Sequence, residues 1–409
     1  MPSRRRTVYC VSKKLGSTLR RLRKLSDLTQ EQLSERSAVS VDVIRHLEQG
    51  RKKSALLPTL HALADALGVE LTTLLGDPPG APSTGEGDSP ALVAVRRAIT
   101  PPLFSALPDP SEAEGLSVSV LRDQIADAWS DYHAAEFDSL MKSFPGIVMD
   151  ARRLVAADLA GAQAALGKVL QLGGHLAVRL GKTDLALMSL ERAIAAADAS
   201  SDPLLTPMIC NSVAWAYQRQ NRLDDATAVA LHAAARVERD HLGTAEGVRV
   251  WGGLLMSAAT SFARRGDYDR ADEMMRTAEK AAERVAKLPA EEDTRMVSVF
   301  SKSSVRIERV RLAVQFGHPE EALRLSKGMR LAKDTPPSWR TWLLLDVARA
   351  HTDVGDAEGA VRTLKALRRV TPTWMQHHTL AVAIVEDLWA LPNHPEGLRS
   401  LAEFLGVAD

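Results

Sequence analysis

The chain has 409 residues, of which 25% are charged and 45% hydrophobic, a mixture typical of a folded globular protein rather than a disordered one. It contains no run of about 18 apolar residues that could form a transmembrane helix, and residues 7–24 lack the long apolar stretch of a secretory signal. The two cysteines, Cys10 and Cys210, are too few for a disulfide framework or a cysteine-rich zinc site, and they fit a reducing, cytoplasmic setting.

Charge is distributed unevenly along the chain. The net charge is only +1, but residues 1–60 contain 14 Lys and Arg against 5 Asp and Glu, whereas the remainder contains 38 against 46. A basic N-terminal module joined to a mildly acidic body predicts a polyanionic partner at one end of the chain. Residues 1–14 are expected to be a basic N-terminal arm, and the sequence leaves open whether this arm touches DNA or has no specific role.

Residues 15–75 are expected to form a compact module of five helices. One face of the first helix carries four leucines, which are Leu15, Leu19, Leu22 and Leu25. Thr29–Gln32 has the pattern of a capping box that opens the second helix, and Ser40 is placed to cap the third. Pro58 lies in the first turn of a fourth helix, and a short fifth helix covers roughly residues 70–75.

Residues 29–51 resemble the helix-turn-helix of the phage-repressor (XRE) family. The resemblance is carried by Thr29-Gln30-x-x-Leu33 and by Val39-Ser40-x-x-x-Ile44-x-x-Leu47-Glu48-x-Gly50-Arg51. The turn between the two helices has Ala38 where the family usually has glycine. Alanine can adopt the left-handed conformation there at modest energetic cost, so we expect the fold to be retained.

The resemblance implies a DNA-contacting role for the exposed positions of the third helix, which would enter the major groove. The base-contacting set would be Val41, Asp42, Arg45 and His46. Arg45 could bind guanine through two hydrogen bonds, and Val41 could meet a thymine methyl group. Asp42 could accept from cytosine N4 or penalise wrong sites, and both interpretations remain open. The phosphate-contacting set would be Gln30, Ser40, Arg51, Lys52 and Lys53, although residues 51–53 could also be a solvated basic loop.

Residues 76–117 are expected to be a Pro- and Gly-rich linker. The stretch 76–90 contains four Gly and four Pro and no large apolar side chain, so it has little to bury. One short helix over residues 91–99 interrupts this composition.

Residues 118–409 are expected to form an all-α, tetratricopeptide-like (TPR-like) solenoid of helix pairs. Five segments share a Gly or Asn followed five residues later by a small residue, namely Gly181…Ala186, Asn221…Ala226, Gly266…Ala271, Gly317…Ala322 and Gly355…Ala360. The Gly or Asn would end a first helix in a left-handed conformation. The intervals between the alanines of successive segments exceed the ~34-residue period of a tetratricopeptide repeat. The alternative interpretation is an unrelated helical bundle.

In such an array the first helix of each pair would line a groove. The candidate ligand-binding residues on that face are Arg179, Asn211, Trp215, Arg219, Arg264, Arg311 and Arg349. Stacked arginines repel one another unless an anion or carboxylates offset their charge. The pattern therefore fits either a peptide or small anionic ligand, or a face that is solvated and internally paired.

The whole chain resembles actinobacterial regulators that join an XRE helix-turn-helix to a C-terminal TPR array. The resemblance rests on Trp129-x-x-Tyr132…Phe137-x-x-Leu140 before Pro145, on Leu190-Glu191-Arg192-Ala193, and on Asp346-x-Ala348-Arg349-Ala350. It implies a transcriptional regulator of the cytoplasm that binds double-stranded DNA as a homodimer formed through the repeats. The alternative is a TPR interaction scaffold with a vestigial or protein-binding helix-turn-helix.

Catalysis is not expected of this sequence. Residues 161–168 imitate a phosphate-binding loop, but five residues separate the glycines and Val169 follows Lys168 where Ser or Thr is needed. The histidines lack the pairing with a carboxylate that a zinc site uses, and they are interpreted as surface or groove residues. We therefore expect no catalytic residue, no metal site and no cofactor.

Overall fold

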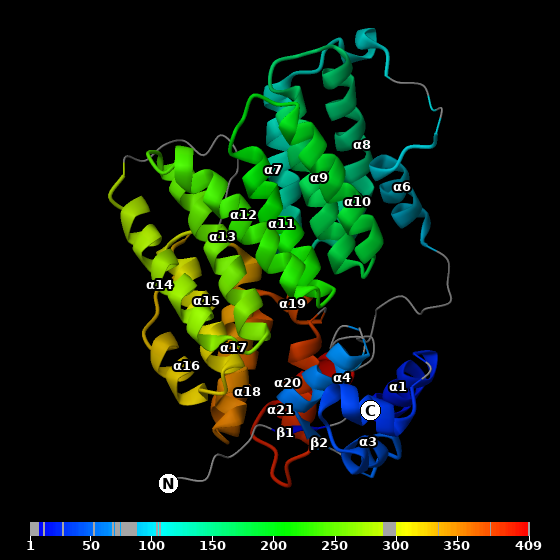
Figure 1. The fold of residues 1–409 in the computed structure, drawn as a ribbon, viewed down its shortest axis with the longest axis vertical. Helices are drawn as coiled ribbons and strands as arrows, with labels where there is room; N and C mark the ends of the chain where they lie inside the picture. Colours follow the sequence, from blue (N-terminus) through cyan, green and yellow to red (C-terminus); the bar gives the residue numbers. More distant parts are fainter. Residues whose placement is uncertain are drawn as a thin grey trace. The chain divides into compact units, whose positions relative to one another are not determined.

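The computed structural model describes residues 8–10, 13–26, 28–51, 54–67, 69, 74, 88–103, 105, 108–288, 300–333, 335–376 and 378–407. The chain divides into two compact units. The first contains residues 1–84, 310–329 and 340–409, and the second contains residues 85–309 and 330–339. Helices dominate both units (Figure 1), so the predicted all-α fold class is confirmed.

The N-terminal module has its own apolar core. Its helices are α1 (Lys13–Leu25), α2 (Gln30–Ser37), α3 (Val41–Glu48) and α4 (Leu57–Ala66). Their apolar faces meet in one cluster that includes Leu15, Leu19, Leu33, Ile44, Leu47, Leu60 and Leu63, all fully buried. Because the buried leucines recur three or four residues apart, each short helix presents one continuous stripe to this core.

Local signals in the sequence set the ends of these helices. Thr29 and Gln32 form the predicted capping box, and the Ser40 side chain caps α3. Between the two helices, Ala38 has φ 53° and ψ 20°, so the turn that usually takes glycine keeps its left-handed conformation with alanine. Pro58 lies in the first turn of α4, as predicted.

A two-stranded antiparallel ladder, which the sequence did not predict, joins β1 (Val8–Cys10) to β2 (Ser54–Leu56). Val8 pairs with Leu56, and Cys10 pairs with Ser54. The region predicted as an arm therefore contains a strand, and its last two residues, Lys13 and Lys14, already belong to α1. The predicted fifth helix lies outside the described residues except for Leu74, which is buried in the module core.

The second unit is built from consecutive helix pairs. The pairs are α7 (Val118–Ala134) with α8 (Phe137–Ala156), α9 (Ala162–Arg179) with α10 (Thr183–Asp198), α11 (Leu205–Arg219) with α12 (Leu223–Asp240), and α13 (Ala245–Arg264) with α14 (Tyr268–Val285). Each helix contacts its pair mate, and each helix of the first three pairs also contacts a helix of the next pair. This is the arrangement predicted from the repeats.

The five Gly and Asn residues that were predicted to end the first helix of each pair, here called step residues, have the expected left-handed conformation. Their φ angles are 70° at Gly181, 58° at Asn221, 81° at Gly266, 74° at Gly317 and 82° at Gly355. The alanine five residues later is fully buried in every pair, at Ala186, Ala226, Ala271, Ala322 and Ala360. A small residue at this position lets the two helices of a pair approach closely. A Cβ atom added at Gly174, on the facing helix, would lie 2.6 Å from the Leu190 side chain.

Much of the segment expected to be linker is packed against the second unit. Helix α6 (Pro90–Ile99) buries Leu92, Val95 and Ile99 and contacts α8, and a short 3-10 helix, η1 (Pro110–Ala113), also contacts α8. Asp88 forms ion pairs with Arg96 at 2.9 Å and with Lys182 at 2.8 Å. The described residues from Asp88 onward are therefore docked, whereas residues 76–87 of the predicted linker lie outside the described residues.

The C-terminal part of the first unit has a separate core. It contains α16 (Pro319–Ser326), α18 (Ala357–Val370), α19 (Pro372–Gln376), α20 (Thr379–Trp389) and α21 (Leu398–Phe404). Two helices, α15 (Lys302–Gln315) and α17 (Pro337–Asp353), have residues in both units. The core is lined by α17, α18, α20 and α21 and includes Leu345, Leu364, Ile384 and Leu401. The last two helices have no counterpart in the predicted repeats.

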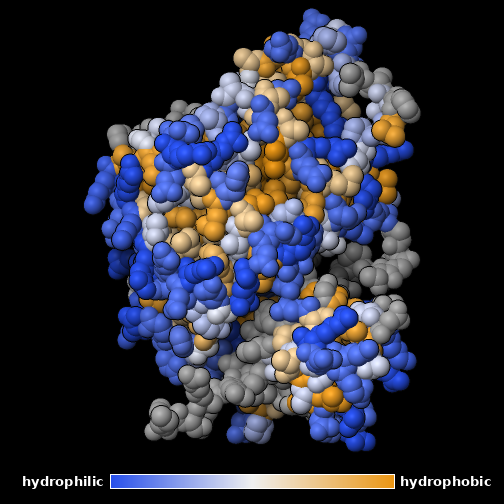
Figure 2. Space-filling model, viewed as in Figure 1, coloured by the Kyte–Doolittle hydropathy of each residue, from blue (hydrophilic) through white to orange (hydrophobic). Residues whose placement is uncertain are grey.

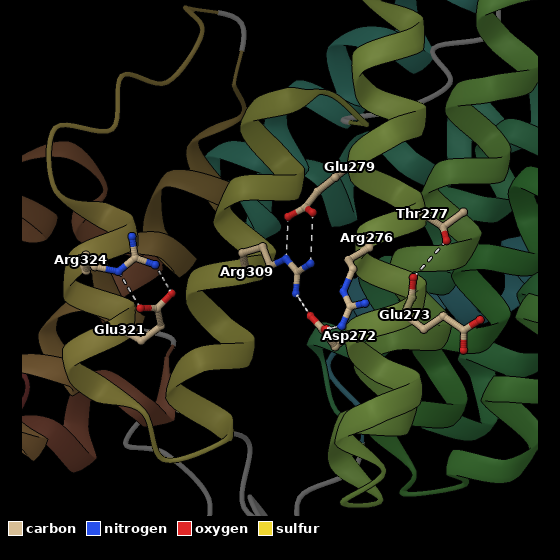
Figure 3. Close-up of polar contacts among 8 residues, drawn as sticks. All are labelled: Asp272, Glu273, Arg276, Thr277, Glu279, Arg309, Glu321 and Arg324. Atoms are coloured by element: carbon tan, nitrogen blue, oxygen red, sulfur yellow. Dashed lines mark hydrogen bonds and ion pairs between the residues drawn. The ribbon is translucent and has the colours of Figure 1, made fainter.

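Polar side chains cover most of the face drawn in Figure 2, as expected for helices that each bury one apolar stripe. Some of these polar groups also join helices. Arg309 of α15 donates to Glu279 of α14 at 2.6 and 3.1 Å and also contacts Asp272 (Figure 3). Burial alone would lower the pKa of Arg309, but the hydrogen bonds that it donates to Glu279 and Asp272 outweigh this effect and raise that pKa.

Candidate nucleic-acid interface

Helix α3 buries one side in the module core and exposes the other side to solvent. Its Ser40 cap accepts a hydrogen bond from the Val43 N–H at 3.4 Å, and Ile44 and Leu47 are fully buried. The predicted base-contacting residues lie on the rest of the helix surface. Asp42, Arg45 and His46 are exposed, whereas Val41 is partly buried. The structure therefore brings all four to one short helix.

Arg45 lies among acidic side chains. Its Nη1 donates to Asp42 Oδ1 at 3.0 Å, and the two side chains remain 45% and 77% exposed. Hydrogen bonds from its own backbone and from Thr29 lower the pKa of Glu31 at the start of α2, and the positive charge of Arg45 contributes to the same effect. The guanidinium is therefore held near the surface and retains further N–H donors.

A buried ion pair fixes the three helices around this surface. Arg23 of α1 donates to both oxygens of Glu48 of α3, at 2.6 and 2.9 Å, and to the Leu28 carbonyl at 2.8 Å. Gln30 of α2 donates to the same carboxylate at 2.8 Å. Burial alone would raise the pKa of Glu48, but the hydrogen bonds from Arg23 and Gln30 outweigh it and lower that pKa. Sequence reasoning missed this pair, which only the folded arrangement brings together.

The predicted phosphate-contacting residues are only partly described. Arg51 is exposed immediately after the turn that ends α3, and Gln30 is half-buried with one amide N–H engaged by Glu48. The Ser40 hydroxyl already caps α3 and accepts a backbone hydrogen bond. Lys52 and Lys53 lie outside the described residues. Their contacts to DNA therefore stay predictions.

The predicted groove residues of the second unit pack against one another. Arg179 Nε donates to Tyr132 Oη at 3.2 Å, and its guanidinium lies 5.3 Å from the centre of the Trp215 ring. His175 stacks on Trp215 with ring centres 4.7 Å apart, and it contacts Trp129 edge-on at 5.0 Å. The face where a ligand was expected is filled at this point by its own aromatic side chains.

Two histidines in this cluster are neutral at physiological pH. Burial lowers the pKa of His175 to about 3, and burial also lowers the pKa of His133 to about 4, with Arg179 adding to both effects. His175 Nε2 lies 2.8 Å from Ser212 Oγ. His175 is therefore packed within this cluster of aromatic side chains.

The remaining predicted groove residues are engaged by protein groups. Arg264 donates to the Gln218 carbonyl and to Asn221 Oδ1, the latter at 3.3 Å. Arg219 also takes part in interactions, and Asn211 is partly buried. In the first unit, Arg311 lies 3.4 Å from Asp346 Oδ2.

Arg349 has a different environment from the one expected. Its side chain is only 4% exposed, and it pairs with Asp387 at 2.8 Å and with Asp353. Burial raises the pKa of Asp353 despite the opposing effect of Arg349. Arg349 is thus buried between two carboxylates and does not line an open groove, because α20 packs against the face of α17 on which Arg349 lies.

A pocket of about 440 Å³ opens elsewhere in the second unit. It is bounded by α7, by the loop before α9, by α9 itself and by the loop before α11, and its charged lining residues are Arg122, Asp158, Lys168 and Asp202. Lys168 is 6% exposed, donates to Gln171 Oε1 at 3.0 Å and lies 5.4 Å from the centre of the Trp129 ring. None of the predicted groove residues lines this pocket.

Comparison with known proteins concerns mainly the N-terminal module. A family model described as a helix-turn-helix domain matches residues 14–74. An uncharacterised HTH-type transcriptional regulator, y4dJ of Sinorhizobium fredii (strain NBRC 101917 / NGR234), is 41% identical over 63 residues, which are 15% of this chain and 80% of that protein. The chain belongs to the helix-turn-helix transcriptional regulators.

Two solved structures are distantly similar to this helix-turn-helix regulator. BtubC (BKLC) from P. vanneervenii is 18% identical with a TM-score of 0.36, covering 63% of this chain and 93% of that one. Bacillus thuringiensis PlcR, in complex with the peptide PapR7 and DNA, is 14% identical with a TM-score of 0.37, covering 77% of this chain and 93% of that one.

Other kinds of site receive no support from the described part of the regulator. None of its helices there combines the length and apolar character of a membrane span. No group of three or more His, Cys, Asp or Glu side chains in the described ranges is arranged to hold a metal ion. Residues 162–168, which imitate a phosphate-binding loop, are helical.

Proposed function

We propose that the chain is a sequence-specific DNA-binding regulator of transcription whose helix α3 reads operator bases in the major groove. The observation that carries this proposal is the surface of α3. Its apolar side is buried in the module core, and its other side presents Asp42, Arg45 and His46 next to a capped N-terminus. The excess of basic residues in the same module supplies attraction for the phosphate backbone.

Each interface residue has a distinct proposed role. Arg45 binds guanine O6 and N7, Val41 meets a thymine methyl group, and His46 contacts a neighbouring base edge. Arg51, Lys52 and Lys53 follow the recognition helix and contact phosphates, together with Gln30 and Ser40 at the starts of α2 and α3. Phosphate contacts fix the position of the helix, and base contacts supply the selectivity.

The helix pairs are proposed to join two copies of the chain and to bind an effector. Two recognition helices would then reach half-sites about 34 Å apart, one turn of DNA. The pocket at the start of α9 is the candidate effector site, because its volume of about 440 Å³ lies within the range of small-molecule pockets. Arg122 and Lys168 in its lining favour a ligand that carries an anionic group. We place the regulator in the cytoplasm, at the nucleoid when it is bound to DNA.

Recovery of genomic fragments on the full-length chain tests this function. We expect a limited set of fragments to be enriched, and we expect Arg45→Ala to abolish the enrichment while leaving most of the salt-sensitive, non-specific binding. Replacing Lys52 should weaken binding to all fragments alike. It should also reduce the slope of the logarithm of affinity against the logarithm of salt concentration by about one unit. If no fragment is enriched at physiological salt, the chain is instead an interaction scaffold.

A further inference from the structure

The proposed recognition surface contains an acidic residue, Asp42, for which the sequence left two interpretations open and to which the roles proposed above assign no contact. DNA is a polyanion, so a carboxylate on the surface that faces it lowers affinity for every sequence. Asp42 is exposed on α3 and lies among the residues assigned to base contact. A role in capping does not account for it, because Ser40 already caps the helix through the Val43 N–H.

Among the residues that the structure describes, the polar partner of Asp42 is Arg45. Oδ1 of Asp42 accepts from Nη1 of Arg45 at 3.0 Å, across one turn of the helix. A guanidinium has five N–H donors, so this bond leaves four for a base. An arginine held in this way has fewer conformations to lose when it binds, and the donors that it retains have a fixed direction.

We propose that Asp42 is a positioning residue that aims Arg45 at a single guanine, and thereby raises selectivity at that base while it lowers overall DNA affinity. The inference rests on the proposed function. At guanine, Arg45 satisfies the acceptors O6 and N7 while it still neutralises Asp42. When another base replaces guanine, that paired arrangement of acceptors is lost, and a fixed guanidinium cannot swing to a phosphate instead.

The competing explanation is structural. A carboxylate in the first turn stabilises a helix through its attraction to the positive end of the helix dipole. If that were the only role of Asp42, its loss would lower the stability of α3 and leave base preference unchanged. Base preference is therefore the readout that separates the two explanations.

The experiment uses the full-length chain and a library of random-sequence duplexes, followed by affinity measurements on one selected duplex and on one unrelated duplex. The variants are Asp42→Ala, Asp42→Asn and Arg45→Ala. Glu35→Ala is the matched control, because it removes one exposed carboxylate from the same module at a position on α2. Far-ultraviolet circular dichroism shows whether each variant is folded.

We expect Asp42→Ala to reduce the preference for guanine about tenfold, at the same base pair where Arg45→Ala loses preference. Binding to the unrelated duplex should strengthen about threefold, because one negative charge is removed. Asp42→Asn should retain part of the preference, since its amide oxygen can still accept from Arg45. Glu35→Ala should leave the selected sequence unchanged.

Two results would overturn the inference while leaving the proposed function intact. In one, Asp42→Ala selects the same sequence as the unmodified chain with the same discrimination. In the other, the base pair that loses discrimination differs from the one read by Arg45. A library from which the unmodified chain selects nothing would instead contradict the proposed function itself.

Discussion

Replacing Arg23 with alanine should loosen helix α3 without changing the side chains that are proposed to face DNA. Arg23 gives two N–H donors to Glu48 and one to the Leu28 carbonyl. The Glu48 side chain is only 3% exposed and that of Arg23 11%. The substitution therefore leaves a buried carboxylate without its cation and a carbonyl without its donor.

The magnitude follows from burial and from the partner that remains. Breaking a fully buried ion pair costs about 3–5 kcal/mol, whereas an exposed pair contributes at most about 1 kcal/mol. Gln30 still donates to Glu48 in the variant, so we expect about 2–3 kcal/mol. That corresponds to about a 30- to 150-fold rise in the equilibrium constant for the local opening of α3. A module of this size has only about 3–9 kcal/mol of stability in total.

Hydrogen exchange of the α3 amides in the full-length chain is the suitable assay. All seven tryptophans follow residue 128, so tryptophan fluorescence does not report directly on the module. Arg21→Ala is the control, because it removes the same charge from an exposed position of α1. Combining Arg23→Met with Glu48→Leu should restore most of the protection, because both charged groups are then replaced by apolar ones. Equal exchange in Arg23→Ala and Arg21→Ala would refute the reasoning.

Three further outcomes are expected. Ala38→Gly should stabilise the module by about 0.5 kcal/mol, since glycine relieves the left-handed strain but loses more backbone entropy on folding. Slower hydrogen exchange of the α2 and α3 amides would confirm this prediction, and faster exchange would contradict it. Gly174→Ala should destabilise the second unit by about 1–3 kcal/mol, because the added Cβ lies 2.6 Å from Leu190. In thermal denaturation Gly253→Ala should cost less, because its added Cβ would lie 3.8 Å from Asn211 Nδ2. Because the pKa of Glu48 is lowered in the folded state, its carboxylate stabilises the fold at pH values above the unfolded pKa, which is near 4.3. The protection of the α3 amides from hydrogen exchange should therefore fall as the pH drops below about 4.5. Glu48→Gln should flatten this pH dependence.

The sequence predicted features that depend on neighbouring residues. The left-handed step residues, such as Gly181 and Asn221, could be identified because few residue types tolerate that conformation. The caps at Thr29 and Ser40 were also predictable, since an N-cap side chain bonds to a backbone group only two or three residues away. Repetition of such signals then indicated the helix pairs.

Features that depend on distant contacts were missed. The β1–β2 ladder joins two segments of three residues, too short for alternation to show. The pairing of Arg349 with Asp387 requires α17 and α20 to meet, and α20 lies beyond the recognisable repeats. The exposed positions of α3 that are proposed to contact bases could be predicted from their spacing along one helix, but the contact between Asp42 and Arg45 needed side-chain geometry.

The ladder between β1 and β2 determines where an isolated DNA-binding fragment should begin. A fragment that starts at Lys13, the first residue of α1, would lack Val8–Cys10 and would leave the backbone groups of Ser54–Leu56 without their partner strand. Such a bare strand edge invites pairing between copies and self-association. A fragment intended for binding studies should therefore retain the residues before α1, although they lie outside the helix-turn-helix itself.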